Sequence, residues 1–308
     1  SFDHEDGGDG FASRLITTIS IILFLLVAVG MYFAPALVRL YAPEFFTAGF
    51  ETEKEIAIAF TRYCLPQIFF LGLFTMLGQV ANARGSFAPL MWAPIANNIV
   101  GIALFGAFLV FSPSLNIDNI SNIQVQVLGW GTTLSVVVQA LVLVPVIKRL
   151  GIKLRPQWGV KGLGKSFGLA GWTLIYVLIS QLGYLVTVNV ATSAAVRSAQ
   201  EGIERGVGYT PYTFAYYVML LPYSIVTISI ITAILPHISR LALEKKAEEV
   251  REQLIRAIRL VGVITIPSAV AFLLFGPLIT SVLFIGIPLE DSRYIGYVLA
   301  ALSFGLVA

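Results

Sequence analysis

The sequence predicts an all-α, polytopic membrane protein: a helical bundle with about seven complete spans and a truncated eighth. The first observation behind this prediction is composition, because 57% of the 308 residues are hydrophobic and only 12% are charged. Soluble domains carry about 25% charged residues. The second is charge placement, since all 20 basic and all 17 acidic residues lie outside seven long apolar stretches. A soluble globular protein and a disordered chain are both excluded, because neither could keep so much apolar surface in water.

Each of the seven stretches is long enough to cross a bilayer as a helix, for which about 20 apolar residues are needed. Membrane barrels show short alternating segments instead. The stretches are Leu15–Val38, Cys64–Ala83, Phe87–Phe111, Val127–Ile147, Ser166–Val196, Tyr209–Ser239 and Leu260–Leu289. An eighth, Tyr294–Ala308, stops in mid-span. Because the start is acidic and glycine-rich, without a signal peptide, we expect an internal piece of a longer transporter.

The basic residues predict the orientation, because Lys and Arg concentrate on the cytoplasmic side of membrane helices. Connections that alternate along the chain carry 14 basic residues on one side and 6 on the other. The start of the chain is therefore predicted to lie in the cytoplasm, with the first span running outward. The segment Ser239–Arg259 has apolar residues on one face and charges on the other. It is predicted to be an amphipathic helix along the inner membrane surface.

The seven stretches contain no charged side chain, whereas intramembrane charges usually mark proton relays and ion sites. A membrane-embedded enzyme would need a paired acid and base, a metal site or an activated nucleophile. The single cysteine, Cys64, and the distant pair His4 and His237 offer neither a disulfide nor metal-ligand spacing. We therefore expect no enzyme, no catalytic residue, no metal and no cofactor.

Uncharged polar residues form stripes on two of the predicted spans. At 100° per residue, five polar residues of the fifth span fall within about 40° of one line. Polar residues of the sixth span lie on two neighbouring faces. Hydrogen bonding between helices and the wall of a water-filled cavity both explain such stripes. The candidates for a substrate cavity are Thr173, Tyr176, Ser180, Tyr184, Thr187, Thr213, Tyr216, Tyr217 and Ser224.

The connection between the second and third spans resembles the hallmark of a known family. The segment Gly78–Val100 reads GQVANARGSFAPLMWAPIANNIV. It contains, in order, Asn82, Ala83, Arg84, Gly85, Phe87, Trp92, Ala93, Pro94, Asn97 and Asn98. This pattern is similar to that of the MurJ/MviN family, the lipid II flippases of the bacterial cell wall. Arg62–Phe70 (RYCLPQIFF), Ser180-Gln181, the ILPHISR helix end and Pro267-Ser268-Ala269 also fit, so the resemblance covers nearly the whole chain.

The resemblance implies that these spans are the third to the tenth of a fourteen-helix transporter. Residues 1–150 would form the end of a first helical bundle, with four spans. Residues 151–308 would start the second, with three spans and a partial fourth. On the same resemblance, the two bundles would rock around a central cavity and move lipid II, an undecaprenyl-linked disaccharide-pentapeptide, across the bacterial cytoplasmic membrane. Membrane lipids are implied as further partners, and nucleic acid is not.

At single positions the chain departs from the family. A cavity-facing arginine of the family falls at Tyr217, its acidic partner at Tyr216, and an acidic ion-binding position near Thr187. How the pyrophosphate is held, and whether a monovalent cation drives the cycle, are left open. Arg84, Asn97 and Asn98 are candidates for a gate or a headgroup contact. Positive-inside anchoring for Arg84 and interhelical hydrogen bonding for the asparagines are the alternatives.

Two other functions compete with flipping of lipid II. One is an ion-coupled exporter of drugs or of another lipid-linked oligosaccharide, on the same architecture. It would need an acidic site within the membrane. The other is a non-transporting membrane scaffold, which would pack its polar stripes tightly and enclose no central cavity.

Overall fold

The computed structural model describes residues 9–112, 119–152, 154–157, 164–202, 206–244 and 246–306, without the side chains of residues 164–170 and 236. Every regular element in these ranges is a helix. Seven helical segments are long and apolar enough to cross a membrane, and they match the seven predicted stretches in order. They are Asp9–Tyr32, Glu51–Ala83, Ala88–Phe111, Asn122–Arg149, Gly171–Gln200, Tyr209–Leu243 and Ala247–Leu283. The all-α membrane fold is thereby confirmed.

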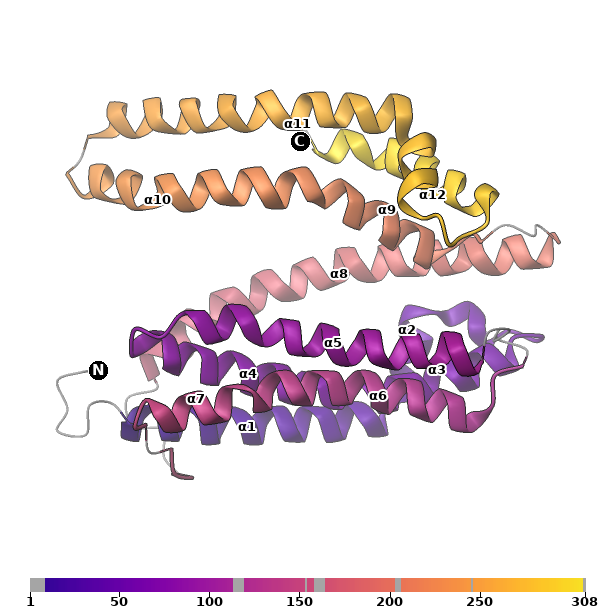
Figure 1. The fold of residues 1–308 in the computed structure, drawn as a ribbon, viewed down its shortest axis with the longest axis horizontal. Helices are drawn as coiled ribbons and strands as arrows, with labels where there is room; N and C mark the ends of the chain where they lie inside the picture. Colours follow the sequence, from indigo (N-terminus) through magenta and orange to yellow (C-terminus); the bar gives the residue numbers. More distant parts are fainter. Residues whose placement is uncertain are drawn as a thin grey trace. The chain divides into compact units, whose positions relative to one another are not determined.

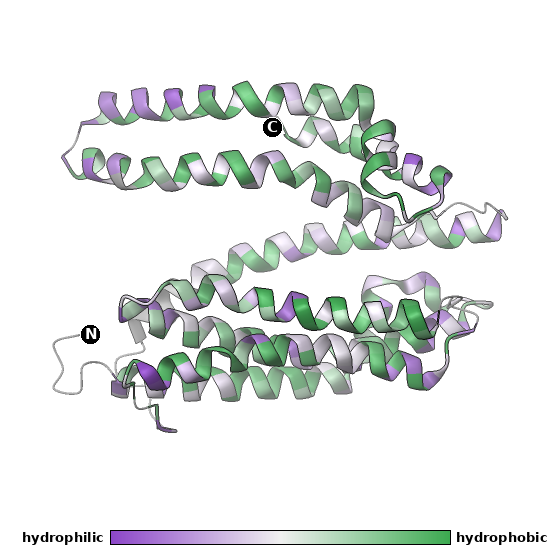
Figure 2. Cartoon of the chain, viewed as in Figure 1, coloured by the Kyte–Doolittle hydropathy of each residue, from purple (hydrophilic) through white to green (hydrophobic). Residues whose placement is uncertain are grey.

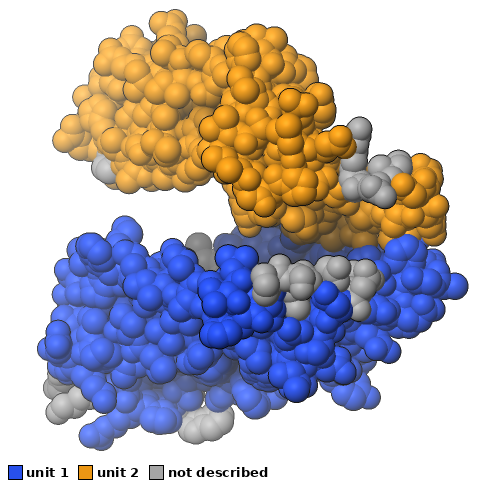
Figure 3. Space-filling view, turned by 45° about the vertical axis from the view of Figure 1, so that its right-hand side comes forward, with its two compact units in different colours: residues 1–186 blue, residues 187–308 orange. Residues whose placement is uncertain are grey.

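Contacts divide the chain into two compact units, residues 1–186 and 187–308, which are coloured separately in Figure 3. The first unit contains α1 (Asp9–Tyr32), α2 (Ala34–Tyr41), η1 (Pro43–Phe46), α3 (Glu51–Cys64), α4 (Pro66–Ala83), α5 (Ala88–Phe111), α6 (Asn122–Leu141) and α7 (Leu143–Arg149). The long helix α8 (Gly164–Gln200) belongs to both units. The predicted bundle boundary at residues 150 and 151 stays a prediction.

Helix α4 organises the first unit, because it packs against α1, α5, α6 and α7 (Figure 1). The buried core of this unit consists of Leu77, Ala81, Ala93, Leu143, Ile147 and Ile152. Outward-facing side chains are equally apolar: Phe24, Met91 and Ile102 are 63%, 75% and 73% exposed. Lipid tails solvate such side chains as well as a protein core does. A bundle that is apolar inside and outside is therefore what the composition requires.

Prolines account for the interruptions within two of the spans. A proline lacks an N–H and so suits the first turn of a helix. Pro35 lies in the first turn of α2, after the break at Phe33, and Pro66 begins α4. Leu65 between α3 and α4 keeps helical φ and ψ. The second span therefore runs as one continuous 33-residue path.

The second unit contains α9 (Tyr209–Pro222), the π-helical segment η2 (Tyr223–Thr227), α10 (Ile228–Leu243), α11 (Ala247–Leu283), α12 (Leu289–Leu302) and η3 (Ser303–Leu306). Helix α12 packs against α11 and α9. Small residues allow this contact, since a Cβ atom on Gly276 would lie 2.4 Å from the carbonyl oxygen of Gly296. Thr280 adds a buried hydrogen bond to the carbonyl of Ser292, at 2.7 Å.

The prediction of one amphipathic helix over Ser239–Arg259 was wrong. The chain turns between α10, which ends at Leu243, and α11, which begins at Ala247. Helix α11 has 37 residues, which at 1.5 Å per residue is about 55 Å, against about 30 Å of hydrocarbon. The helix is therefore longer than the hydrocarbon is thick, and its charged first turns extend beyond it. With the end of α10 these turns form a helical hairpin, and Figure 2 shows hydrophilic residues gathered there. Amphipathic periodicity cannot distinguish a surface helix from the protruding end of a span.

Candidate polar lining of the membrane spans

The polar stripe predicted on the fifth span lies on α8. Thr173, Tyr176, Ser180 and Tyr184 are all exposed, and Tyr176 is 71% exposed. The Ser180 hydroxyl donates to the carbonyl of Tyr176 at 2.9 Å, a bond within its own helix. The Tyr184 ring meets the Tyr41 ring of α2 edge-on, with the ring centroids 6.3 Å apart. This stripe therefore presents aromatic faces and hydroxyl groups.

A row of tyrosines on α9 is the most ordered polar feature of the second unit. Tyr209 stacks on Tyr212, with ring centroids 6.2 Å apart, and Tyr212 stacks on Tyr216 at 6.1 Å with an interplanar angle of 11°. The Tyr217 ring follows at 6.4 Å from Tyr216, tilted by 47°. We call these four residues the tyrosine ladder. Exposure increases along it, from half-buried Tyr209 and Tyr212 to 61% exposed Tyr217.

Thr187, in the C-terminal half of α8, connects this helix to the ladder, because its side chain is hydrogen-bonded to that of Tyr212. The structure thus brings Thr187, Tyr216 and Tyr217 of the predicted set to one place. Sequence analysis missed Tyr209 and Tyr212. Their spacing of three and four residues up to Tyr216 would have placed all three on one helix face.

The remaining two candidates of the sixth span are placed differently. Thr213 is half-buried, and its hydroxyl donates to the carbonyl of Tyr209 at 2.9 Å. Ser224 is exposed. It is the second residue of η2, which begins directly after Pro222. A π-helical turn is common at functional sites and shifts the register of the faces that follow it. In the same segment the Thr227 hydroxyl is buried without a hydrogen-bond partner.

The hallmark segment forms the turn between α4 and α5. The N–H of Ser86 donates to the carbonyl of Ala81, and the N–H of Gly85 to that of Asn82. This is the Schellman pattern of a helix C-terminus, which places a left-handed residue after the cap. Gly85 has φ +77°, which only glycine adopts without strain. The Asn-Ala-Arg-Gly sequence is thus first of all a helix-ending signal.

Arg84 caps that helix, and its guanidinium meets the carboxylate of Asp9 at the start of α1, with Nη2 and Oδ1 2.6 Å apart. Both side chains are partly exposed, at 33% and 23%. This ion pair ties the α4–α5 turn to the first span. Asn98 is exposed, while Asn97 donates from Nδ2 to Oε1 of Gln139 on α6, at 2.9 Å. The adjacent asparagines therefore face different surroundings, as two neighbours on a helix must.

A second polar network in the first unit was not found by sequence reasoning. Nε2 of Gln67 on α4 donates to the hydroxyls of Thr132 and Thr133 on α6, both at 3.3 Å. Thr133 in turn donates to the carbonyl of Tyr63 at 2.6 Å. Close packing of α3 and α6 at Gly129 supports the network, since a Cβ there would lie 2.6 Å from Cβ of Tyr63. These bonds join α4 and α3 to α6.

Metal-ligating side chains do not cluster in the part of the chain that the structure describes. No group of three or more His, Cys, Asp or Glu side chains lies close enough there to hold an ion. The side chains of the candidate lining are those of threonine, serine and tyrosine, with hydroxyl groups and aromatic faces.

Comparison with known proteins decides the family. The model of the family described as "Lipid II flippase MurJ" matches residues 2–308. The chain belongs to this family. MurJ-family membership and the seven apolar helices make it a multi-pass protein of the bacterial inner membrane.

Individual relatives agree with this assignment. "Lipid II flippase MurJ" of Burkholderia cenocepacia is 26% identical over 235 residues, covering 74% of this chain and 42% of the relative. "Probable lipid II flippase MurJ" of Vibrio cholerae is 24% identical over 308 residues, covering 96% of this chain and 54% of the relative. A protein of the same name from Buchnera aphidicola is 24% identical over 281 residues, covering 89% of this chain and 50% of the relative. The chain thus spans about half the length of the curated relatives it matches.

A solved structure titled "Lipid II flippase MurJ, inward closed conformation" shares the fold. Its TM-score is 0.73 at 19% identity, and the match covers 99% of this chain and 59% of that one. The order of helices described above is therefore that of a MurJ fold.

Proposed function

We propose that this chain is part of a lipid II flippase and that it contributes cavity wall to the alternating-access transport of lipid II. The relatives named above are lipid II flippases, which supports this substrate. Flipping carries a bulky polar headgroup across hydrocarbon while the prenyl tail stays in lipid. No covalent bond changes, so the protein acts as a transporter and not as an enzyme.

The tyrosine ladder is the observation that carries the proposal at residue level. Stacked rings with hydroxyl groups at their edges suit a disaccharide headgroup, which offers both apolar ring faces and hydroxyls. Tyr217 and Tyr216 would contact the headgroup directly, because they are the exposed end of the ladder. Thr187 and Tyr212 would fix the orientation of their rings. Thr173, Tyr176, Ser180 and Tyr184 of α8, with Thr213 and Ser224, would supply further neutral contacts.

The hallmark residues have a different proposed role. We assign Arg84 to the cytoplasmic gate, where its ion pair with Asp9 closes the turn between α4 and α5. Opening of this pair would expose the guanidinium to a phosphate group. Asn97, through Gln139, would hold α5 against α6 as the bundle moves, and exposed Asn98 would be the headgroup contact of the pair.

Orientation and coupling follow from charge. The 14 to 6 distribution of basic residues supports a cytoplasmic location for the start of the chain. Membrane lipids surround the spans as their solvent. The seven apolar stretches contain no carboxylate, so we infer that a coupling cation would bind outside these stretches.

Replacement of the ladder's exposed end tests the proposal. Tyr216→Leu/Tyr217→Leu removes two hydroxyl contacts of about 1 kcal/mol each, so lipid II exposure should fall about 10-fold or more in cells depleted of their own flippase. Tyr297→Leu is the matched control, because Tyr297 on α12 is 63% exposed and lies outside the ladder. Full exposure of lipid II with the double variant at normal protein levels would remove the ladder from the mechanism.

A further inference from the structure

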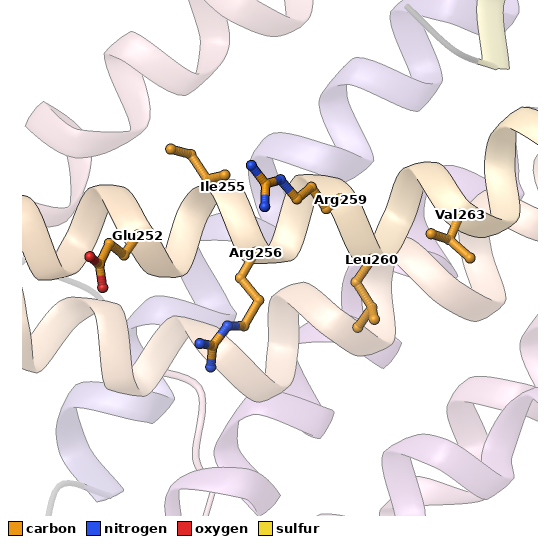
Figure 4. Close-up of a pocket in the computed structure, with 6 residues that line it drawn as sticks. All are labelled: Glu252, Ile255, Arg256, Arg259, Leu260 and Val263. Atoms are coloured by element: carbon orange, nitrogen blue, oxygen red, sulfur yellow. The ribbon is translucent and has the colours of Figure 1, made fainter.

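The charged first turns of α11 carry an open hollow that the transport mechanism does not use. It has a volume of about 580 Å³ and is lined by Glu252, Ile255, Arg256, Arg259, Leu260 and Val263 (Figure 4). All six residues belong to the second unit. Figure 4 shows Arg256 and Arg259 one turn apart, with their guanidinium groups directed to opposite edges of the helix. Glu252 lies a turn earlier and Val263 a turn later.

Two other cations of the hairpin are paired, unlike the two arginines of this hollow. Arg251 is paired with Glu248 at 3.4 Å, and Lys246 is paired with Glu244 at 3.0 Å. Among the described residues, neither Arg256 nor Arg259 has an ion-pair partner. With Glu252 included, the hollow has a net charge of +1. It is therefore suited to a ligand group with a single negative charge.

The other end of the hollow is apolar. Leu260 and Val263 are 53% and 70% exposed, and the chain has no charged residue from Leu260 to Leu289. The hollow thus lies where the charged hairpin gives way to the apolar span. In a membrane protein this is the level of the lipid phosphates, with hydrocarbon on one side and water on the other.

We propose that this hollow binds an anionic glycerophospholipid of the inner leaflet. The Arg256 and Arg259 side chains turn toward each other to hold its phosphodiester, because the fork of N–H donors in arginine matches phosphate oxygens. An acyl chain lies along Leu260 and Val263. An anionic phospholipid with one phosphodiester has a net charge of −1, which balances the net charge of the hollow. A zwitterionic phospholipid has no net charge, and a diphosphate has more than one negative charge, so neither balances it. This site is independent of the flippase proposal.

Binding of defined lipids to the intact protein tests this site. The delipidated protein is titrated in detergent with phosphatidylglycerol and with phosphatidylethanolamine, and bound lipid is counted by native mass spectrometry. Phosphatidylglycerol should bind at least 10-fold more tightly than phosphatidylethanolamine. Arg256→Gln/Arg259→Gln should abolish this preference, whereas Arg251→Gln, which also removes one hairpin charge, should keep it. Equal binding of the two lipids, or an unchanged preference in the double variant, would overturn the proposal.

Further measurements separate the sources of phosphate. Inorganic phosphate should not displace phosphatidylglycerol at equal concentration, because it makes no contact with the apolar end. A prenyl diphosphate should compete less well than phosphatidylglycerol. If it competes better, the occupant is a diphosphate lipid and the proposal is wrong. Val263→Glu leaves both arginines in place. It should weaken phosphatidylglycerol binding, because it puts a carboxylate where the acyl chain would lie. No effect of this variant would contradict the lipid site.

Discussion

Single residues explain why the hallmark sequence is built as it is. The left-handed φ at position 85 requires glycine, and the ion pair with Asp9 requires the guanidinium of Arg84. Position 81 is completely buried, which favours the small side chain of alanine. From the sequence, the tight turn was predictable. The partner of Arg84 was not, because Asp9 is 75 residues away along the chain and the pairing depends on how α1 packs against α4.

Gly85→Ala tests this account of the turn. Alanine at φ +77° is strained by about 1 kcal/mol or more, so the variant should unfold at a lower temperature. Gly101→Ala is the control, because Gly101 lies within α5 and a Cβ atom there meets open space. Alanine favours helix over glycine, so the control should be neutral or more stable. Thermal unfolding of both variants in detergent gives the comparison, and equal stability losses would refute the strain at Gly85.

The tyrosine ladder marks the limit of sequence reasoning at this scale. Helical spacing predicted that Tyr216 and Tyr217 lie on neighbouring faces. It did not predict which rings stack, because stacking depends on side-chain rotamers. The link from Thr187 to Tyr212 joins two helices whose relative placement no periodicity gives.

At the scale of elements, the sequence predicted the spans well because burial in lipid requires long uncharged runs and internally bonded backbone. Helix ends were harder. Ser121 and Gln124 form a capping box at the start of α6, several residues before the apolar stretch from Val127. The α10–α11 hairpin was also missed, because charged residues on both sides of its turn continue one helical pattern.

The turn of this hairpin should respond to pH. The Lys246 ammonium, hydrogen-bonded to Glu244, holds the pKa of that carboxyl below its usual value. A carboxyl with a lowered pKa contributes stability above its unfolded-state pKa and loses it as the pH falls through the folded-state value. The protection of the Leu243, Glu244 and Lys246 amides, measured as the exchange rate corrected for its intrinsic pH dependence, should therefore decrease at pH values below the normal range for glutamate.

Glu244→Gln is the matched variant for this effect. Its amides in this turn should be less protected than those of the parent at neutral pH, and their protection should not decrease further on acidification. Both groups are on the surface, so the effect is local and leaves global unfolding unchanged. The same acid response in parent and variant would mean that this ion pair does not order the turn.

At the scale of the whole molecule, the distribution of basic residues predicts one topology for all seven spans. In a Cys64→Ala background, Thr52→Cys should react with a membrane-impermeant thiol reagent added outside the cell. Glu249→Cys, on the α10–α11 hairpin, should react only after the membrane is opened. Both positions are exposed, so access to solvent does not bias the comparison. The reverse pattern would invert the orientation and place the proposed phospholipid site in the outer leaflet.

Transport of lipid II is the central claim, and reconstitution tests it most directly. The intact protein that contains this chain is placed in vesicles with lipid II labelled on its headgroup, and loss of label to an external quencher or hydrolase is followed with time. The account predicts lipid II translocation well above that of empty vesicles, with a rate that falls about 10-fold in Tyr216→Leu/Tyr217→Leu and stays unchanged in Tyr297→Leu. Translocation no faster than in empty vesicles would contradict the proposed function.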